Sequence, residues 1–187
     1  GKRIIEHSEK NPCITLGKGR GAYQSWHANF KIKDRLQHTE PLRDLEVTEE
    51  EEQRIVLEDE RGTQLQCSVE DGELFLRVMP AEGAETEYNR MWLNLSGEST
   101  EHLYGCGEQY SQLDLKGSRV PLWVEEQGVG RGKGLITLFA NIHSHAGGHW
   151  YSTYYPATSF VSSEGWYCYA EARAYAEFDF TYERVYS

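Results

Sequence analysis

Hydrophobic residues alternate with polar ones along most of the chain, in short stretches separated by turn residues. In residues 64–79, apolar side chains recur at every second position on both sides of Asp71-Gly72. An Asp-Gly pair between two alternating stretches is among the strongest hairpin signals that a sequence offers. Arg61-Gly62 and Glu164-Gly165 mark similar turns. The pattern predicts an all-β fold, an antiparallel β-sandwich, with residues 1–187 forming a single domain.

Three further stretches show the two-residue period of a half-buried strand. Residues 26–33 place Trp26 and Ile32 on one face and lysines on the other, and residues 166–170 alternate Trp, Cys and Ala with two tyrosines. Residues 136–142 alternate as well, and a strand is predicted there too. A long amphipathic helix is not predicted anywhere. The alternating residues of this third stretch are Ile136, Leu138, Ala140 and Ile142.

Size and charge exclude several classes of protein. The chain has 187 residues, too few for a (β/α)₈ barrel of typically ~250 residues. Its net charge is -11, with 30 acidic against 19 basic residues, so it should repel phosphate backbones and bind no nucleic acid. No apolar run approaches the ~18 residues of a membrane span, and no signal peptide precedes the chain, so we expect no membrane partner and a cytoplasmic location.

Two other features of composition have plain interpretations. The acidic run Glu49–Glu52 is expected in a solvated turn or strand end rather than in a cation site. The four cysteines, at positions 13, 67, 106 and 168, stand far apart without metal-ligand spacing, and we expect reduced thiols.

The stretch from Tyr104 to Arg131 is the most unusual part of the chain. Six of its 28 residues are Gly or Pro, and polar and aromatic residues stand between them. Glycine allows positive φ values and close passage of another backbone. Loops of this kind are often recognition surfaces, although a series of turns between strands would have the same composition.

Histidines and carboxylates near this stretch were considered for chemistry. His143 and His145 would share a face if they lay on a strand, but no nearby Asp or Cys completes a set with His149. We therefore expect no metal and a polar loop that contacts a ligand or another domain. Glu125 and Glu126 are adjacent and should point in opposite directions.

A stand-alone glycosidase would need two carboxyl groups about 5–5.5 Å apart for a retaining reaction. Only Glu108 and Glu126 could form such a pair, across strands. The segment Gly128–Gly132 has the glycine content of a phosphate loop without its G-x-x-x-x-G-K-[ST] spacing. The residues alone thus predict a β-rich domain with a loop face toward a ligand or partner.

Specific motifs add a family resemblance. Tyr104-Gly105-Cys106-Gly107-Glu108 resembles the Y-G-x-G-E motif at the end of the N-terminal β-sandwich of glycoside hydrolase family 31, the retaining α-glycosidases. Further segments resemble the sulfoquinovosidase-like branch of that family, and the likeness is continuous from about Tyr104 to Phe180. Among them are Pro121-Leu122-Trp123, Glu126-Gln127-Gly128-Val129-Gly130-Arg131, Ala146-Gly147-Gly148 and Phe160-Val161-Ser162.

The resemblance implies a galactose-mutarotase-like sandwich followed by a catalytic (β/α)₈ barrel that is absent from this chain. Catalytic residues would lie in that barrel and none in this chain, and no cofactor would be required. The implied partners are the barrel and a carbohydrate substrate, an α-glycoside whose sugar can carry a sulfonate group. The residues implied at the rim of the substrate pocket are Gln109, Glu126, Gln127, Gly128 and Arg131, with Tyr110 and Trp123 as supporting aromatics.

A second interpretation is a free-standing carbohydrate-binding β-sandwich, which would stack exposed aromatics on sugars and cut no bond. The two differ in what they expose. A docking domain should present a contiguous apolar patch of several hundred Å², whereas a free module should present a polar surface with one aromatic groove.

Overall fold

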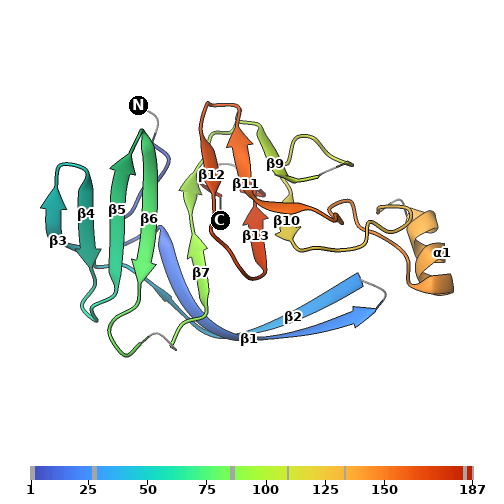
Figure 1. The fold of residues 1–187 in the computed structure, drawn as a ribbon, viewed down its shortest axis with the longest axis horizontal. Coiled ribbons are helices and arrows are strands. Elements are labelled where there is room, and N and C mark those ends of the chain that lie inside the picture. The colour runs from blue at the N-terminus through green and yellow to red at the C-terminus, as the bar shows by residue number, and fades with distance from the viewer. Residues whose placement is uncertain are drawn as a thin grey trace. The chain divides into compact units, whose positions relative to one another are not determined.

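The computed structural model describes residues 3–26, 29–84, 87–108, 110–132, 134–182 and 185–186. Antiparallel strands dominate these residues (Figure 1), which confirms the predicted all-β sandwich class. The chain divides into two compact units, and each is described by itself. Unit 1 comprises Gly1–Gly21 and Asp34–Leu95, and unit 2 comprises Ala22–Lys33 and Ser96–Ser187.

The strands and the helix follow one another in a simple order. The first half of the chain contains β1 (Ile14–Trp26), β2 (Asn29–Pro41), β3 (Glu46–Glu51), β4 (Arg54–Glu58), β5 (Gln64–Glu70), β6 (Glu73–Met79), β7 (Arg90–Leu93) and β8 (Leu95–Ser96). The second half contains β9 (Leu103–Gly107), β10 (Arg119–Leu122), α1 (Gly134–Ser144), β11 (Pro156–Ser162), β12 (Tyr167–Tyr169), β13 (Ala176–Asp179) and β14 (Val185–Tyr186).

Unit 1 is built on the meander β3-β4-β5-β6, with β1 paired to β7 in a second sheet. The two sheets share a core in which Ile14, Leu16 and Leu65 are buried. The β5–β6 hairpin turns at Asp71-Gly72, whose φ angles are 50° and 85°. Two positive φ values in a two-residue loop are those of a type I′ turn, so the Asp-Gly prediction is confirmed.

Two other sequence predictions have different outcomes, one in unit 1 and one in the stretch 26–33, which belongs to unit 2. Every residue of β3 is exposed, so the acidic run beginning at Glu49 lies on a solvated strand end as expected. The single strand predicted over residues 26–33 is wrong, because β1 ends at Trp26 and β2 begins at Asn29. The alternation of Trp26, Phe30 and Ile32 runs across the break in the sequence and therefore could not reveal it; Ala28 lies outside the described residues.

Unit 2 packs the sheet β12-β11-β9 against the pair β10-β13. The buried Phe160 ring of β11 meets Phe178 and Phe180 edge-on, each at 5.0 Å between centroids. The turn at Glu164-Gly165 joins β11 to β12 as predicted, with Gly165 at a φ of 82°. The tyrosines of β12 are exposed and Cys168 is half-buried, which confirms the alternation of that stretch.

An ion pair closes the end of the β10–β13 ladder. Arg119 lies opposite Asp179, and its guanidinium donates to the carboxylate at 2.5 and 3.1 Å. Burial alone would raise the pKa of Asp179, but hydrogen bonds from Thr181 and from Arg119 outweigh it and lower that pKa.

The strand predicted over residues 136–142 is wrong, since this stretch forms the helix α1. Leu135, Leu138, Phe139 and Ile142 also follow the 3.6-residue period, so this apolar run fits both structures. No Ser, Thr, Asp or Asn stands in residues 128–133, in front of the helix, to announce its start. The helix ends at Ser144, and the next residue, His145, has a φ of 51° and donates its N–H to the carbonyl of Asn141 at 3.1 Å, an αL cap.

Two general properties complete the description. Cys13, Cys67, Cys106 and Cys168 are free thiols, and burial raises the pKa of Cys106 to about 12. No helix in the described residues is long and apolar enough to cross a bilayer.

Candidate functional site: the loops of unit 2

The glycines of the Tyr104–Glu108 motif serve the packing of two strands. β9 pairs with β11 across an irregular register, in which Gly107 faces Pro156 and Gly105 faces Phe160. A Cβ at Gly107 would stand 2.0 Å from the carbonyl oxygen of Tyr155, and one at Gly105 would stand 2.9 Å from a backbone oxygen. Both glycines also have positive φ values. The motif therefore marks a close backbone approach rather than a ligand-binding loop.

A second close approach joins two loops that the sequence separates by about 20 residues. Val129 donates its N–H to the carbonyl of Ala146 at 2.8 Å and accepts from the N–H of Gly148 at 3.1 Å. A Cβ at Gly148 would stand 1.9 Å from the carbonyl oxygen of Gln127, and one at Gly128 would stand 2.4 Å from the nitrogen of Gly148. We call residues 127–132 and 146–148 the loop crossing. Gly128 and Gly148 allow this close contact between two loops. The glycines of residues 128–132 thus serve backbone packing, and their spacing is not that of a phosphate loop.

Arg131 fastens the loop crossing to its surroundings. Its guanidinium donates to the carbonyls of Trp150 and Ser152 and to the hydroxyl of Ser111, each at 2.9 Å. The same group lies 5.8 Å from the centre of the exposed Tyr110 ring. Three fixed hydrogen bonds and a cation–π contact give Arg131 a holding role within unit 2.

The adjacent carboxylates Glu125 and Glu126 lie in different surroundings, as their adjacency predicts. Glu125 is buried and accepts a hydrogen bond of 2.6 Å from the hydroxyl of Ser152. Glu126 is exposed and accepts a hydrogen bond from the hydroxyl of Tyr154. That bond raises the pKa of Tyr154, because it stabilises the protonated phenol. Glu126 therefore presents a carboxylate at the surface, whereas Glu125 supports the loop from inside.

The remaining predicted rim residues lie on the same loops. Gln127 and Gly128 belong to the loop crossing and are half-buried. The ring of Trp123 packs against Tyr175 with 5.9 Å between centroids. Gln109 lies outside the described residues. The structure thus gathers most of the predicted residues on connected loops of unit 2, and their role at a substrate pocket stays a prediction.

Two alternatives for chemistry at these loops can also be examined. The H-x-H stretch is not on a strand: His143 lies in the last turn of α1, and His149 stacks on Tyr151 with 5.1 Å between ring centroids. No three His, Cys, Asp or Glu side chains gather as a metal site in the described part of the chain. A hydrogen bond to Glu108 raises the pKa of Tyr110. Glu108 and Glu126 thus pair with different tyrosines, Tyr110 and Tyr154.

Several residues that build these loops were not predicted. Ser152 and Tyr154 hold the two glutamates, but they stand 27 and 28 residues away from them. A parallel bridge between Val124 and Thr153 brings the segments together. No short-range spacing can encode such a pairing.

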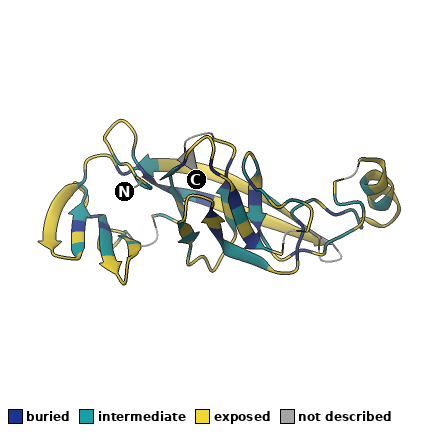
Figure 2. Ribbon diagram, turned by 90° about the horizontal axis from the view of Figure 1, so that it is seen from above, coloured by how far each residue is buried: buried dark blue, intermediate teal, exposed yellow. Residues whose placement is uncertain are grey.

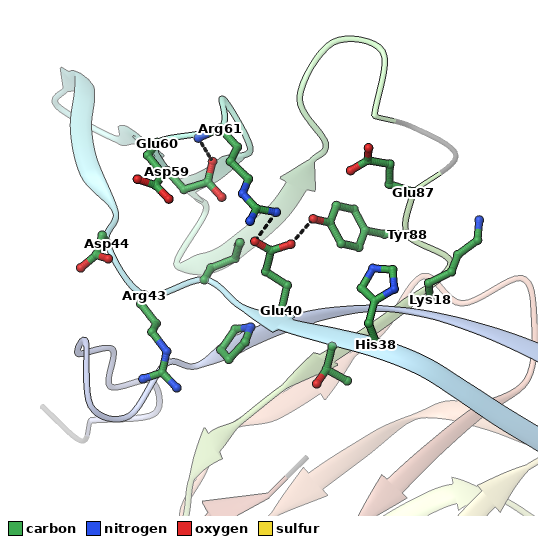
Figure 3. A pocket seen from close by; sticks show the side chains of 13 residues that line it. Lys18, His38, Glu40, Arg43, Asp44, Asp59, Glu60, Arg61, Glu87 and Tyr88 are labelled. Atoms are coloured by element: carbon green, nitrogen blue, oxygen red, sulfur yellow. Dashed lines mark hydrogen bonds and ion pairs between the residues drawn. The ribbon is translucent and has the colours of Figure 1, made fainter.

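Unit 1 contains a groove of about 800 Å³ that was not predicted. Figure 3 shows Glu40 at its centre, paired with Arg61 at 2.5 Å and accepting a hydrogen bond from the hydroxyl of Tyr88. Charges of both signs surround this cluster, among them Lys18, Arg43, Asp59 and Glu60. The central carboxylate therefore already has two partners within unit 1.

Comparison with known proteins defines the class. Residues 7–134 match the glycosyl hydrolase 31 N-terminal galactose mutarotase-like domain. This match covers more than half of the chain and ends at the first residue of α1. The chain belongs to this family, and the sandwich described above is its N-terminal domain.

Particular relatives place the chain more closely. It is 36% identical over 184 residues to a sulfoquinovosidase of Escherichia coli (strain K12) and 34% identical over 184 residues to a sulfoquinovosidase of Agrobacterium fabrum (strain C58). The alignments cover 95% and 96% of this chain but 26% of each relative. A GH31 family sulfoquinovosidase from E. rectale, solved in complex with the aza-sugar inhibitor IFGSQ, superposes with a TM-score of 0.88 at 32% identity, over 99% of this chain and 27% of that one. The chain is thus similar to the N-terminal quarter of sulfoquinovosidases.

Proposed function

We propose that this chain is the non-catalytic N-terminal domain of a retaining α-glycosidase that acts on sulfoquinovosides, and that its Glu126–Arg131 loop forms part of the substrate-pocket wall. Similarity to sulfoquinovosidases along almost the whole chain supports the substrate class. The chain spans about a quarter of the length of those relatives, so the bond-breaking carboxylates belong to the part of the protein that lies outside it. A retaining reaction needs two such groups and no cofactor.

The observation that carries the pocket-wall role is the way in which the loop is held. An exposed carboxylate and an amide, Glu126 and Gln127, stand on a segment whose backbone is fixed by the loop crossing and by Arg131. Groups that orient a substrate must be rigid, since a displacement of about 1 Å can cost 10²-fold in rate. A polar loop without function would not need this much support.

The chemistry of these side chains limits what they could bind. A carboxylate accepts hydrogen bonds, and an amide both donates and accepts. Glu126 is therefore suited to the hydroxyl groups of a sugar and would repel a sulfonate. We expect it to face the hydroxyl-bearing edge of the substrate, and the sulfonate to be bound by cationic or neutral donors elsewhere in the protein.

The test uses the full-length protein with Glu126→Gln and Gln127→Ala, assayed on a chromogenic α-sulfoquinovoside. A hydrogen bond to a charged group contributes about 1.5–3 kcal/mol, so Glu126→Gln should lower kcat/KM by roughly 10- to 100-fold. Glu50→Gln, at an exposed position of β3 in unit 1, is the matched control and should be neutral. Unchanged kcat/KM in both loop variants would remove the proposal.

A second candidate, the free-standing carbohydrate-binding module, has one observation in its favour. Tyr167 and Tyr169 are exposed on β12, with Val161 exposed opposite Tyr167. Tyrosine rings on a sheet face can stack on sugars. Sugar-induced quenching of tyrosine fluorescence that is lost in Tyr167→Ala, without any hydrolysis by the full-length protein, would favour this candidate over the first.

A further inference from the structure

The helix α1 has its large apolar side chains on the outside. Leu135, Leu138, Phe139 and Ile142 are between 51% and 70% exposed, and no residue of the helix is fully buried. Their spacing of i, i+3, i+4 and i+7 puts them on one face, which we call the α1 stripe. Figure 2 shows most of the helix in the colour of exposed residues.

The side of the helix that meets unit 2 carries small and polar residues. Thr137 and Ala140 are half-buried. A Cβ at Gly130 would stand 2.5 Å from the hydroxyl oxygen of Thr137, and the amide oxygen of Asn141 accepts the N–H of Gly147 at 2.9 Å. In an ordinary surface helix the apolar face lies on the core and the polar face in water. Here the arrangement is reversed, which indicates that the α1 stripe is covered by something outside the described residues.

We propose that the α1 stripe is the surface by which this domain docks on the remainder of its own polypeptide, and that this docking fixes the loop crossing next to it. The inference rests on the proposed function in so far as the remainder is a catalytic domain. The relatives provide the occupant: the chain matches 26% of their length, so roughly three-quarters of such a protein lies outside it.

The size of the stripe favours this occupant over a second copy of the chain. A helix of 11 residues is about 16 Å long at 1.5 Å per residue and about 10 Å wide, so one face covers on the order of 200 Å². A stable dimer usually buries about 800 Å² on each partner. Two domains on one polypeptide can associate through a smaller surface, because the linkage keeps their effective concentration high.

The helix and the candidate pocket loop are mechanically connected. Thr137 packs on Gly130 in the first segment of the loop crossing, and Asn141 accepts a hydrogen bond from Gly147 in the second segment. Gln127 is the first residue of the loop crossing, and Glu126 immediately precedes it. Docking through α1 therefore positions the two side chains proposed to contact substrate, and α1 acts as a positioning element.

The first test measures solvent access in the full-length protein. Leu138→Cys is compared with Leu74→Cys, since the two leucines are equally exposed here, at 51% and 52%. Each rate of maleimide labelling is divided by the rate in denaturant. A docked stripe predicts that Leu138→Cys is labelled at least tenfold more slowly than Leu74→Cys, at every protein concentration. Equal rates would overturn the proposal.

Dilution separates the two occupants. Protection that disappears on dilution, in step with dimer dissociation seen by analytical ultracentrifugation, would assign the stripe to a second copy and also overturn the proposal. Labelling needs no substrate, so a failure of the docking proposal is distinguishable from a failure of the pocket-wall proposal. The latter is judged on the kinetics of the Glu126 and Gln127 variants.

The second test examines the connection to the loop crossing. The double variant Leu138→Ser, Phe139→Ser is compared with Leu74→Ser, Phe75→Ser, which changes another exposed Leu-Phe pair, on β6. The α1 variant should increase proteolytic cleavage within residues 124–155 and raise KM for the sulfoquinovoside at least threefold, and the β6 variant should do neither. Cleavage and KM that stay at wild-type values in the α1 variant contradict the positioning role.

Discussion

Alanine at Gly148 tests the loop crossing most directly. The new Cβ would stand 1.9 Å from the carbonyl oxygen of Gln127 and 2.8 Å from its carbon, both of them backbone atoms that cannot rotate away. The φ angle at Gly148 lies outside the left-handed region, so alanine itself suffers no conformational penalty there. The effect of Gly148→Ala is therefore that of a single steric contact.

The size of the effect follows from this geometry. Ordinary contact with a Cβ begins at 3.4 Å, so the two strands of the crossing must separate by about 1.5 Å (3.4 minus 1.9). Such a movement breaks the hydrogen bonds from Gly148 to Val129, at 3.1 Å, and from Gly132 to Gly148, at 3.0 Å. Each contributes about 0.5–1.5 kcal/mol net, so the free energy of unfolding should fall by about 1–3 kcal/mol.

Chemical denaturation of the full-length protein measures this change, with Gly21→Ala as the control. A Cβ at Gly21 would meet its nearest atom at 3.4 Å without a left-handed φ, so that variant should be neutral. Because Gln127 is the residue displaced, Gly148→Ala should also lower kcat/KM on the sulfoquinovoside. If Gly148→Ala unfolds at the same denaturant concentration as Gly21→Ala, the two loops do not cross as closely as described.

Three further predictions concern unit 2. The lowered pKa of Asp179 stabilises the fold above pH ~4, and this contribution is lost as pH falls through the folded pKa. In denaturation at pH 2–7, the free energy of unfolding of Asp179→Asn should therefore fall less steeply with acid than that of the wild type. An unchanged pH dependence contradicts the role of the pair with Arg119. Glu101 is fully buried and accepts the indole N–H of Trp166 at 2.7 Å; Glu101→Ala leaves that donor without an acceptor and should cost about 1–3 kcal/mol in thermal or chemical unfolding, whereas a neutral result would show that water replaces the carboxylate. Cys106, with its pKa raised to about 12, should resist maleimide at pH 8 until the protein unfolds, and fast labelling of the folded protein would contradict its burial.

Local patterns predicted the elements whose cause is local. Asp71-Gly72 defines a hairpin because two adjacent residues must adopt positive φ, and these residue types do so readily. The exposed tyrosines of β12 follow in the same way from the alternation of a half-buried strand. In both cases the information lies within a few residues of the element.

The failures occurred where the decisive contact is distant. The stretch 136–142 satisfies the periods of both strand and helix, and its helical state depends on Thr137 and Asn141 meeting loops from either side. The partners of Glu125 and Glu126 come from a segment almost 30 residues away. The family resemblance selected residues that the structure gathers on connected loops of unit 2, and their role at a substrate pocket stays a prediction.

The reversed helix has a consequence for biosynthesis. In a protein as long as the relatives, about 520 residues lie outside this domain, since 184 residues are 26% of the total. At ~5–20 residues per second, the ribosome would need roughly 25–100 s to complete them. During this time α1 would expose Leu138 and Phe139 on an already folded domain, a target for chaperones that bind nascent chains. The rate at which the later domain emerges, rather than the stability of the sandwich, would then limit the yield of soluble protein.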